Sequence, residues 1–338
     1  MRLSIIIPAY KAADFIEKCI RSLEDQDVPK SQYEIIVTND GSPDDSRLIV
    51  EKLQLEFPNI QLINQENQGV SVARNNAMAI AKGRYVMPID ADDYVVPQLL
   101  KAILDRAESE DLDILVLGFE IFDPLGKSVW KTDYRQQEPQ VYSGVEGYFA
   151  SRGYEIRDPD RSVAILYKND MLQRHQLQYP KGVPFLEDGC FLLKVFSVAE
   201  SAGFVDRVFY QRTTSIGSAT VSGVFYSDKA IQGFIKAAAN LKIFVQTNEL
   251  TFIQQGLLNH GIVKYIVLSI SQDVSIRSFG RFIATVGKLK AKGFSQLSTS
   301  GVRGSYRTYA TWYNISPYFF FVQYAKEIVL KRIRLGMS

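Results

Sequence analysis

The sequence predicts an α/β fold in which a mostly parallel sheet is flanked by helices and followed by a helical C-terminal extension. Apolar, β-rich runs recur about every 30 residues early in the chain, with stretches of helical spacing between them, and this alternation is typical of βαβ units. The runs are almost wholly apolar, as parallel strands buried on both faces are. From residue 226 on, apolar residues recur at helical spacing instead. The β-rich runs are Leu3–Ile7, Tyr33–Thr38, Ile60–Ile63 and Tyr85–Ile89.

Three helices are expected between these strands. The first carries its apolar residues on one face. The second begins in segment 42–45, where Ser42 is the expected N-cap and acidic residues follow at the positive end of the helix dipole. The third runs from Val70 to Lys82 and ends at Gly83 as a C-cap. The first helical face consists of Phe15, Ile16, Cys19, Ile20 and Leu23.

The composition is that of a globular protein: 46% of the 338 residues are hydrophobic and 22% are charged, which excludes a disordered chain. Cys19 and Cys190 are too few for a disulfide framework, so a reducing compartment is expected. His175 and His260 lie far apart, which excludes a Cys/His zinc site. Pro8 interrupts the N-terminal apolar run, and no apolar stretch is long enough to span a membrane. We therefore expect a cytoplasmic location.

Charge is divided unevenly along the chain. Residues 226–338 carry 15 Lys and Arg against four Asp and Glu, a net charge of +11, which leaves −9 for residues 1–225. The aromatic segment 318–324 precedes the basic segment 331–334, a combination that suits an anionic membrane surface. A helical cap that packs its aromatics on the rest of the protein, or on a second copy, fits equally well. No nucleic-acid-binding module is present, so nucleic acid is not expected as a partner.

Polar side chains follow each of the four strands. Ligands bind outside the carboxyl ends of parallel strands, so these residues should line one cleft. The carboxylates among them would repel one another unless a cation lies between them. Neither the glycine-rich dinucleotide fingerprint nor a P-loop occurs, so the usual phosphate cradles are absent. The four segments are Pro8-Ala9-Tyr10, Asn39-Asp40-Gly41-Ser42, Asn64–Gly69 and Asp90-Ala91-Asp92-Asp93.

These segments, together with Gly69-Val70-Ser71-Val72-Ala73-Arg74-Asn75, resemble the family-two inverting glycosyltransferases of bacterial polysaccharide biosynthesis. The resemblance implies a GT-A fold, with a Rossmann-like sheet, and transfer of a sugar from a nucleotide diphosphate to an acceptor hydroxyl. It divides the chain into a GT-A catalytic domain at 1–225 and a helical, basic region at 226–338. Within the catalytic domain, residues 1–100 would form the nucleotide-binding half and residues 101–225 the acceptor half.

The resemblance also implies a role for the acidic D-x-D segment. Asp92 would bind Mn²⁺ or Mg²⁺, both of which accept hard oxygen ligands, and Asp90 would face the metal or the ribose. The metal would stabilise the leaving nucleotide diphosphate. A turn or helix cap is the alternative for a D-x-D standing alone, and Asp93 before Tyr94 could be one.

Further donor-binding residues follow from the same resemblance. Asp40 would accept a hydrogen bond from the base or ribose, or would make an Asx turn before Ser42. Tyr10 would stack on the base, or would be a core aromatic. Arg74 would contact the diphosphate or neutralise the acidic cleft, with a surface ion pair as the alternative. Other expected contacts of the donor nucleotide are Pro8, Ala9 and Ala91.

The general base is expected at Asp188, with Glu187 as its neighbour or substitute, because the resembled family carries an acidic pair at this place. Acids in a first helical turn also favour the dipole, so the pair has an ordinary explanation as well. Arg212 and Ser215 belong to a segment that would fold over the donor and hold its diphosphate, or would be a polar loop. Some relatives carry a histidine metal ligand in that segment, and this chain does not.

The sequence thus predicts a metal-dependent inverting glycosyltransferase that uses a nucleotide-diphosphate sugar, with a UDP-sugar as the default donor. The acceptor would be a saccharide or a lipid-linked saccharide in cell-surface polysaccharide synthesis, such as capsule, at the inner face of the membrane. A catalytically weak nucleotide-sugar-binding scaffold is the alternative. A nucleotidyltransferase is a weaker one, because Pro8-Ala9-Tyr10-Lys11 is not the glycine-rich loop that such enzymes need.

Overall fold

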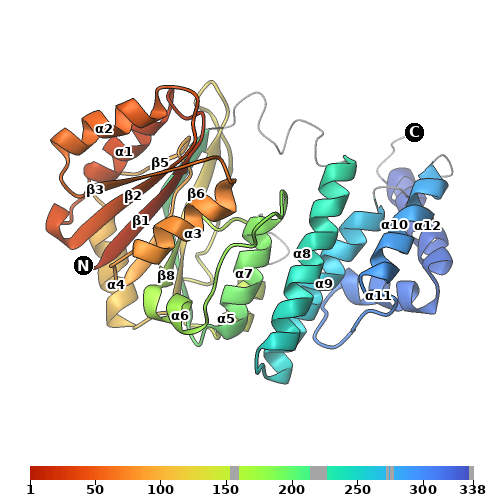
Figure 1. Cartoon of the computed structure of the whole chain (residues 1–338). Coiled ribbons are helices and arrows are strands. Elements are labelled where there is room, and N and C mark those ends of the chain that lie inside the picture. Colours follow the sequence, from red (N-terminus) through yellow and green to blue (C-terminus); the bar gives the residue numbers. More distant parts are fainter. Residues whose placement is uncertain (153–159, 214–226, 272–273, 275–277, 335–338) are drawn as a thin grey trace. The chain divides into compact units, whose positions relative to one another are not determined.

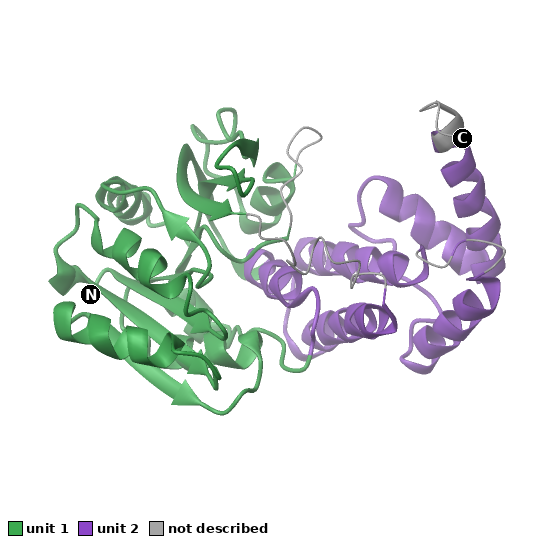
Figure 2. Cartoon of the chain, turned by 90° about the horizontal axis from the view of Figure 1, so that it is seen from above, with its two compact units in different colours: residues 1–182, 198–218 green, residues 183–197, 219–338 purple. Residues whose placement is uncertain are grey.

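The computed structural model describes residues 1–152, 160–213, 227–271, 274 and 278–334 (Figure 1). The chain forms two compact units, and each is described by itself (Figure 2). The first unit comprises residues 1–182 and 198–218, and the second comprises residues 183–197 and 219–338. Helix α7 (Glu187–Val198) therefore groups with the C-terminal helices. The domain boundary at residue 225 stays a prediction.

The first unit is built on one nine-stranded sheet of order β3-β2-β1-β4-β8-β6-β9-β5, with β7 paired to β6. Strands β1 to β4 are mutually parallel, and β6 is parallel to β9. The pairs β4–β8, β6–β8, β5–β9 and β6–β7 are antiparallel. The α/β class is confirmed, and its continuous parallel part is the N-terminal half. The strands are β1 Leu3–Ala9, β2 Tyr33–Asp40, β3 Ile60–Gln65, β4 Tyr85–Pro88, β5 Tyr94–Val95, β6 Ile114–Phe122, β7 Ser128–Lys131, β8 Ile165–Lys168 and β9 Ala202–Thr213.

Helices cover both faces of this sheet (Figure 1). Leu3, Ile5 and Ile7 of β1 share a buried cluster with apolar residues of α1, α2 and α4. Helix α3 packs on β1 and β2 from the opposite face. Because both faces are covered, β1, β2 and β4 are buried along almost their whole length, as predicted for parallel strands. The helices of this unit are α1 Ile16–Glu24, the 3₁₀ turn η1 Lys30–Gln32, α2 Ser46–Glu56, α3 Val70–Ile80, α4 Leu100–Ser109, α5 Gly144–Ala150 and α6 Asn169–Arg174.

Two predicted helix ends differ from the structure. Helix α2 begins at Ser46 and not at Ser42, because Ser42 bonds across the sheet edge: its Oγ accepts from the backbone N–H of Lys11 at 2.6 Å and donates to Asp44 at 2.6 Å. Helix α3 ends at Ile80, so Gly83 is not its C-cap. Gly83 instead donates its N–H to Ser4 Oγ at 2.8 Å, in direct contact with the backbone of β1. Tertiary hydrogen bonds decided both positions.

The second unit is helical, as predicted for the tail. Helix α9 is buried on nearly all sides between α8 and the later helices, and Gly261 allows it to approach Leu193 of α7 closely. None of the helices in the described part of the chain has the length and apolar character that a membrane crossing demands. The C-terminal helices are α8 Asp228–Thr247, α9 Phe252–Ser271, α10 Phe279–Ala291, α11 Ser305–Ile315 and α12 Pro317–Arg334.

Gly83→Ala is expected to destabilise the first unit by about 1–3 kcal/mol, because a Cβ there meets the backbone of Leu3 and Ser4, which cannot rotate away. Gly287→Ala in α10 is the matched control. Its Cβ meets no atom within 4 Å, and alanine favours helix over glycine by up to about 1 kcal/mol. Thermal unfolding of the two variants checks the pair, and equal melting temperatures would contradict the close approach.

Candidate active site

A cleft of about 480 Å³ opens at the carboxyl ends of β1, β2 and β4. The predicted strand-end residues gather around it, because the parallel register brings the ends of neighbouring strands to one edge. Lys11, Ala12, Phe15, Asn67, Gly69 and Val70 complete the lining. The predicted residues that line it are Pro8, Ala9, Tyr10, Asp40, Asp90, Ala91 and Asp92.

Three carboxylates meet at one side of this cleft. Asp90, Asp92 and Asp93, named here the acid cluster, place one oxygen each within 4.8 Å of one another. Asp93 is buried, and burial together with the charges of Asp90 and Asp92 raises its pKa to about 8. Partial desolvation and the charge of Asp90 raise the pKa of Asp92 as well. The cluster is therefore held together against its own repulsion.

The acid cluster fits a hard divalent cation. Its donors are all carboxylate oxygens, which Mg²⁺ and Mn²⁺ prefer. Asp93 Oδ1 is buried and has no hydrogen-bond partner among the described residues, so the cluster contains an oxygen that this part of the chain does not satisfy. A cation at the three carboxylates would lower the repulsion that the raised pKa values reflect.

Tyr210 of β9 forms hydrogen bonds with both ends of the acid cluster. Its hydroxyl donates to Asp93 Oδ2 at 2.6 Å and accepts from the backbone N–H of Asp90 at 3.1 Å. The ring is fully buried and stacks on Phe119, with 5.2 Å between centroids. One hydroxyl thus joins the first and last residues of the Asp90–Asp93 turn. Sequence reasoning missed Tyr210, although it lies two residues before the predicted Arg212, and alternate residues of a strand share a face.

Arg74 of α3 is buried at 3% exposure and bonds Asp90 Oδ1 through Nη2 at 2.6 Å. Its guanidinium carbon also lies 5.0 Å from the centre of the Tyr179 ring. The alternative of a surface ion pair is therefore wrong, because the pair is buried on the arginine side. A cation that approaches Asp90 would meet a carboxylate already shared with Arg74.

Asp40 holds the loop that follows β3. Its Oδ1 accepts from Gln65 Nε2 at 2.7 Å and from the N–H of Gln68 at 2.8 Å, and its Oδ2 accepts from the N–H of Gly69 at 2.9 Å. Asp40 does not make the expected Asx turn; the N–H of Ser42 donates to Oδ1 of Asn39, three residues earlier, at 3.1 Å. A base-binding role for Asp40 stays a prediction.

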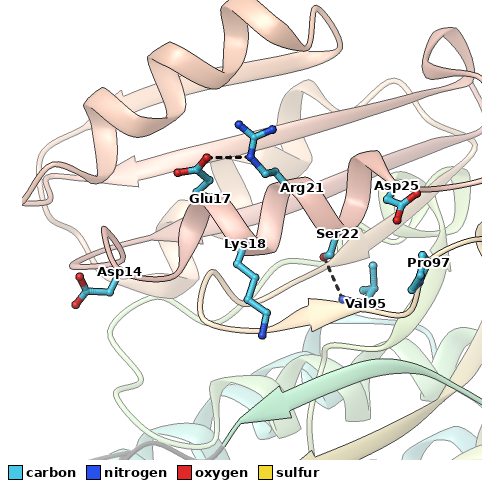
Figure 3. Close-up of a pocket in the computed structure, with 8 residues that line it drawn as sticks. All are labelled: Asp14, Glu17, Lys18, Arg21, Ser22, Asp25, Val95 and Pro97. Atoms are coloured by element: carbon cyan, nitrogen blue, oxygen red, sulfur yellow. Dashed lines mark hydrogen bonds and ion pairs between the residues drawn. The ribbon is translucent and has the colours of Figure 1, made fainter.

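Helix α1 supports the segment that follows the acid cluster. Ser22 Oγ accepts from the N–H of Val95 at 3.1 Å, and Gln26 Oε1 accepts from the backbone N–H groups of Leu99 and Leu100. A shallow hollow runs along this junction, with Lys18 and the Glu17–Arg21 ion pair on its rim (Figure 3). Lys18 Nζ lies 3.4 Å from the centre of the Tyr94 ring. These contacts connect α1 to the segment that directly follows the acid cluster.

The remaining predicted residues lie elsewhere. Arg212 is in β9, and its charge lowers the pKa values of Asp92 and Asp93 against the larger effects that raise them. Ser215 lies outside the described residues. Glu187 and Asp188 begin α7 in the second unit, so the cleft described here consists of first-unit residues alone.

A sheet of this order, with an acid cluster after its fourth strand, defines a GT-A glycosyltransferase fold, as the resemblance implied. The chain belongs to the family described as Glycosyl transferase family 2, whose profile matches residues 4–198.

The curated relatives of this chain include two bacterial glycosyltransferases. The uncharacterized glycosyltransferase EpsJ of Bacillus subtilis is 31% identical over 219 residues, which are 62% of this chain and 60% of EpsJ. Poly(ribitol-phosphate) beta-N-acetylglucosaminyltransferase TarS of Staphylococcus aureus is 27% identical over 222 residues, which are 64% of this chain and 36% of TarS. The chain thus spans less than two thirds of either relative.

Solved structures share the fold. The crystal structure of S. aureus TarS 1–349 with UDP-GlcNAc aligns with a TM-score of 0.73 and 18% identity, covering 100% of this chain and 93% of that chain. The mannosyltransferase PcManGT of Pyrobaculum calidifontis, in complex with GDP-Man and Mn²⁺, aligns with a TM-score of 0.53 and 14% identity, covering 98% and 88%. At these identities the likeness concerns the fold.

Tyr210→Phe is expected to cost about 1–3 kcal/mol of stability, because the buried Asp93 loses its donor. If Mn²⁺ with UDP raises the melting temperature of the wild-type protein, the variant is also expected to show at most half of that rise. Tyr33→Phe is the control, because it removes a buried tyrosine hydroxyl that donates to Glu24, away from the cleft. A ligand response equal in both variants would contradict a positioning role for Tyr210.

Proposed function

We propose that this protein is an inverting glycosyltransferase. It transfers a sugar from a UDP-sugar to a hydroxyl of a saccharide or lipid-linked saccharide in bacterial cell-surface polysaccharide synthesis. The observation that carries the proposal is the acid cluster at the edge of the strand-end cleft, in a chain of glycosyl transferase family 2. The UDP and UDP-GlcNAc complexes of TarS support a uridine donor.

Asp92 and Asp90 are the proposed ligands of Mn²⁺ or Mg²⁺, which when bound neutralises the diphosphate leaving group as a Lewis acid. Tyr210 joins the Asp93 carboxylate to the backbone N–H of Asp90 and so supports the turn that carries these two ligands. Arg74 keeps Asp90 turned toward α3 through its ion pair. Arg212 adds a positive charge near Asp92, where a diphosphate oxygen would gain from it. Tyr10 is about half exposed at the cleft and is the proposed stacking partner of the base.

Asp188 is the proposed general base, with Glu187 beside it at the start of α7. In an inverting transfer the acceptor hydroxyl attacks the anomeric carbon from the face opposite the diphosphate. Asp188 takes the hydroxyl proton as the new glycosidic bond forms and the nucleotide diphosphate departs with its electron pair. A scaffold that only binds a nucleotide-sugar needs the acid cluster but no general base, so the presence of Asp188 favours transfer.

Three further expectations remain proposals: the domain boundary at residue 225, a location at the inner face of the cell membrane, and contact of the basic C-terminal region with that membrane. The helical nature of this region and its excess of basic side chains support the last.

Asp188→Asn is expected to lower the transfer rate about 10²–10⁴-fold while UDP binding stays unchanged, because only the proton acceptor is lost. Asp228→Asn is the matched control, since Asp228 also lies in the first turn of a helix but outside the proposed site. Sugar transfer and UDP-induced thermal stabilisation are measured on both. If Asp188→Asn transfers sugar as fast as the control, the base assignment fails.

UDP with Mn²⁺ is expected to raise the melting temperature, and EDTA is expected to remove the rise, because a ligand of the native state stabilises it by mass action. GDP and dTDP are measured in parallel to identify the donor base.

Asp92→Asn should weaken metal-dependent UDP binding at least tenfold, about 1.4 kcal/mol. The same variant should leave the metal-free protein at least as stable, because it removes a charge that Asp90 repels. A full response to UDP in EDTA would contradict metal dependence.

A further inference from the structure

Helix α12 exposes an apolar stripe along its whole length. Tyr318, Val322 and Val329 are 58%, 60% and 55% exposed, and Phe319 and Leu330 flank them on the same side. The spacings of four and seven residues place these side chains on one helical face. We call this set, with Lys326, the α12 face. Exposed apolar groups on one helix face of this extent mark an interaction surface.

The opposite side of α12 holds the helix to the second unit. Phe320 is fully buried and stacks on Phe282 of α10, with 6.5 Å between ring centres, and on Tyr324 at 5.2 Å. Glu327 accepts from the Tyr309 hydroxyl of α11 at 2.8 Å. The helix therefore has a packed inner side, and its apolar outer face is an additional feature that this packing does not use.

The α12 face carries only positive charge. Lys326 lies in the middle of the stripe and is exposed, whereas Lys331, four residues after Glu327, lies on the other side of the helix. Within Pro317–Lys331, where side chains are described, the single acidic residue is Glu327, which points to α11. Phe279 of α10 extends the apolar surface, because its ring lies 6.2 Å from that of Tyr318.

A second copy of the chain fits this face poorly. In a two-fold interface the same surface meets itself, so residues near the centre of the stripe lie opposite their own copies. Lys326 occupies that position, and burying two ammonium groups against each other without a counter-ion is costly. An anionic lipid surface has no such conflict, because apolar side chains enter the interface while lysines meet phosphate groups.

We propose that the α12 face docks on an anionic lipid bilayer, with α12 in the plane of the interface. Tyr318, Phe319 and Val322 enter the headgroup–acyl boundary, and Lys326 contacts lipid phosphates. The inference locates the membrane contact in the fold and does not rest on transferase activity, because docking needs neither donor nor acceptor.

The test is sedimentation of the full chain with vesicles of phosphatidylcholine alone, or of phosphatidylcholine mixed with phosphatidylglycerol. The wild-type protein is expected to bind the anionic vesicles at low salt and to bind the neutral ones at least tenfold more weakly. Val322→Asn/Val329→Asn should lower binding to anionic vesicles at least tenfold. Leu48→Asn/Leu55→Asn is the matched control, since these leucines are also exposed and also seven residues apart, on α2.

The lysine is tested separately. Lys326→Gln should weaken anionic binding about fivefold and reduce its dependence on salt. Light scattering of the same proteins gives their oligomeric state. The proposal is overturned if the wild-type protein does not sediment with anionic vesicles, or if the α12 valine variant sediments like its control. It is also overturned if the wild-type protein is a dimer that becomes monomeric in that variant, which would assign the face to a second copy.

Discussion

Repulsion among three carboxylates at the end of β4 is the constraint on which the first unit depends. Asp90, Asp92 and Asp93 lie within four positions of the sequence, so their charges are kept close and contacts from other elements offset the repulsion. Arg74 binds Asp90 from α3, and the Tyr210 hydroxyl joins Asp93 to the backbone of Asp90. These contacts span 16 to 120 residues of sequence, so the arrangement of the cluster depends on α3 and β9.

The strands were predictable because their signal is local. A run of apolar residues indicates a buried parallel strand whatever lies elsewhere in the chain, and β1 to β4 appear where those runs stand. The start of α2 was not predictable in this way. Serine is a favoured N-cap residue, yet the Oγ of Ser42 accepts from the backbone N–H of Lys11, which lies 31 residues away. Local preference favours a cap there by about 1 kcal/mol, and a tertiary pair of hydrogen bonds outweighs it.

The candidate site also contains residues that could be predicted from local sequence and residues that could not. Residues that end a strand could be placed at the cleft from sequence, since strand direction alone brings Tyr10, Asp40 and Asp92 to one edge. Tyr210 could not, because nothing in its own segment shows that its hydroxyl meets Asp93 across the sheet. The role of Arg74 was predictable in part. Its position at the start of α3 indicated that it lies near the cleft, but its packing against Tyr179 could not be inferred without the structure.

The anchoring of Asp40 also determines which positions beside the cleft are free to vary. Two of its three hydrogen bonds come from the main-chain N–H groups of Gln68 and Gly69, which every residue except proline possesses. The shape of this loop is therefore encoded in one carboxylate and not in the side chain of Gln68. Evolution can exchange that side chain, and with it the chemistry presented beside the cleft, without losing the loop that carries it.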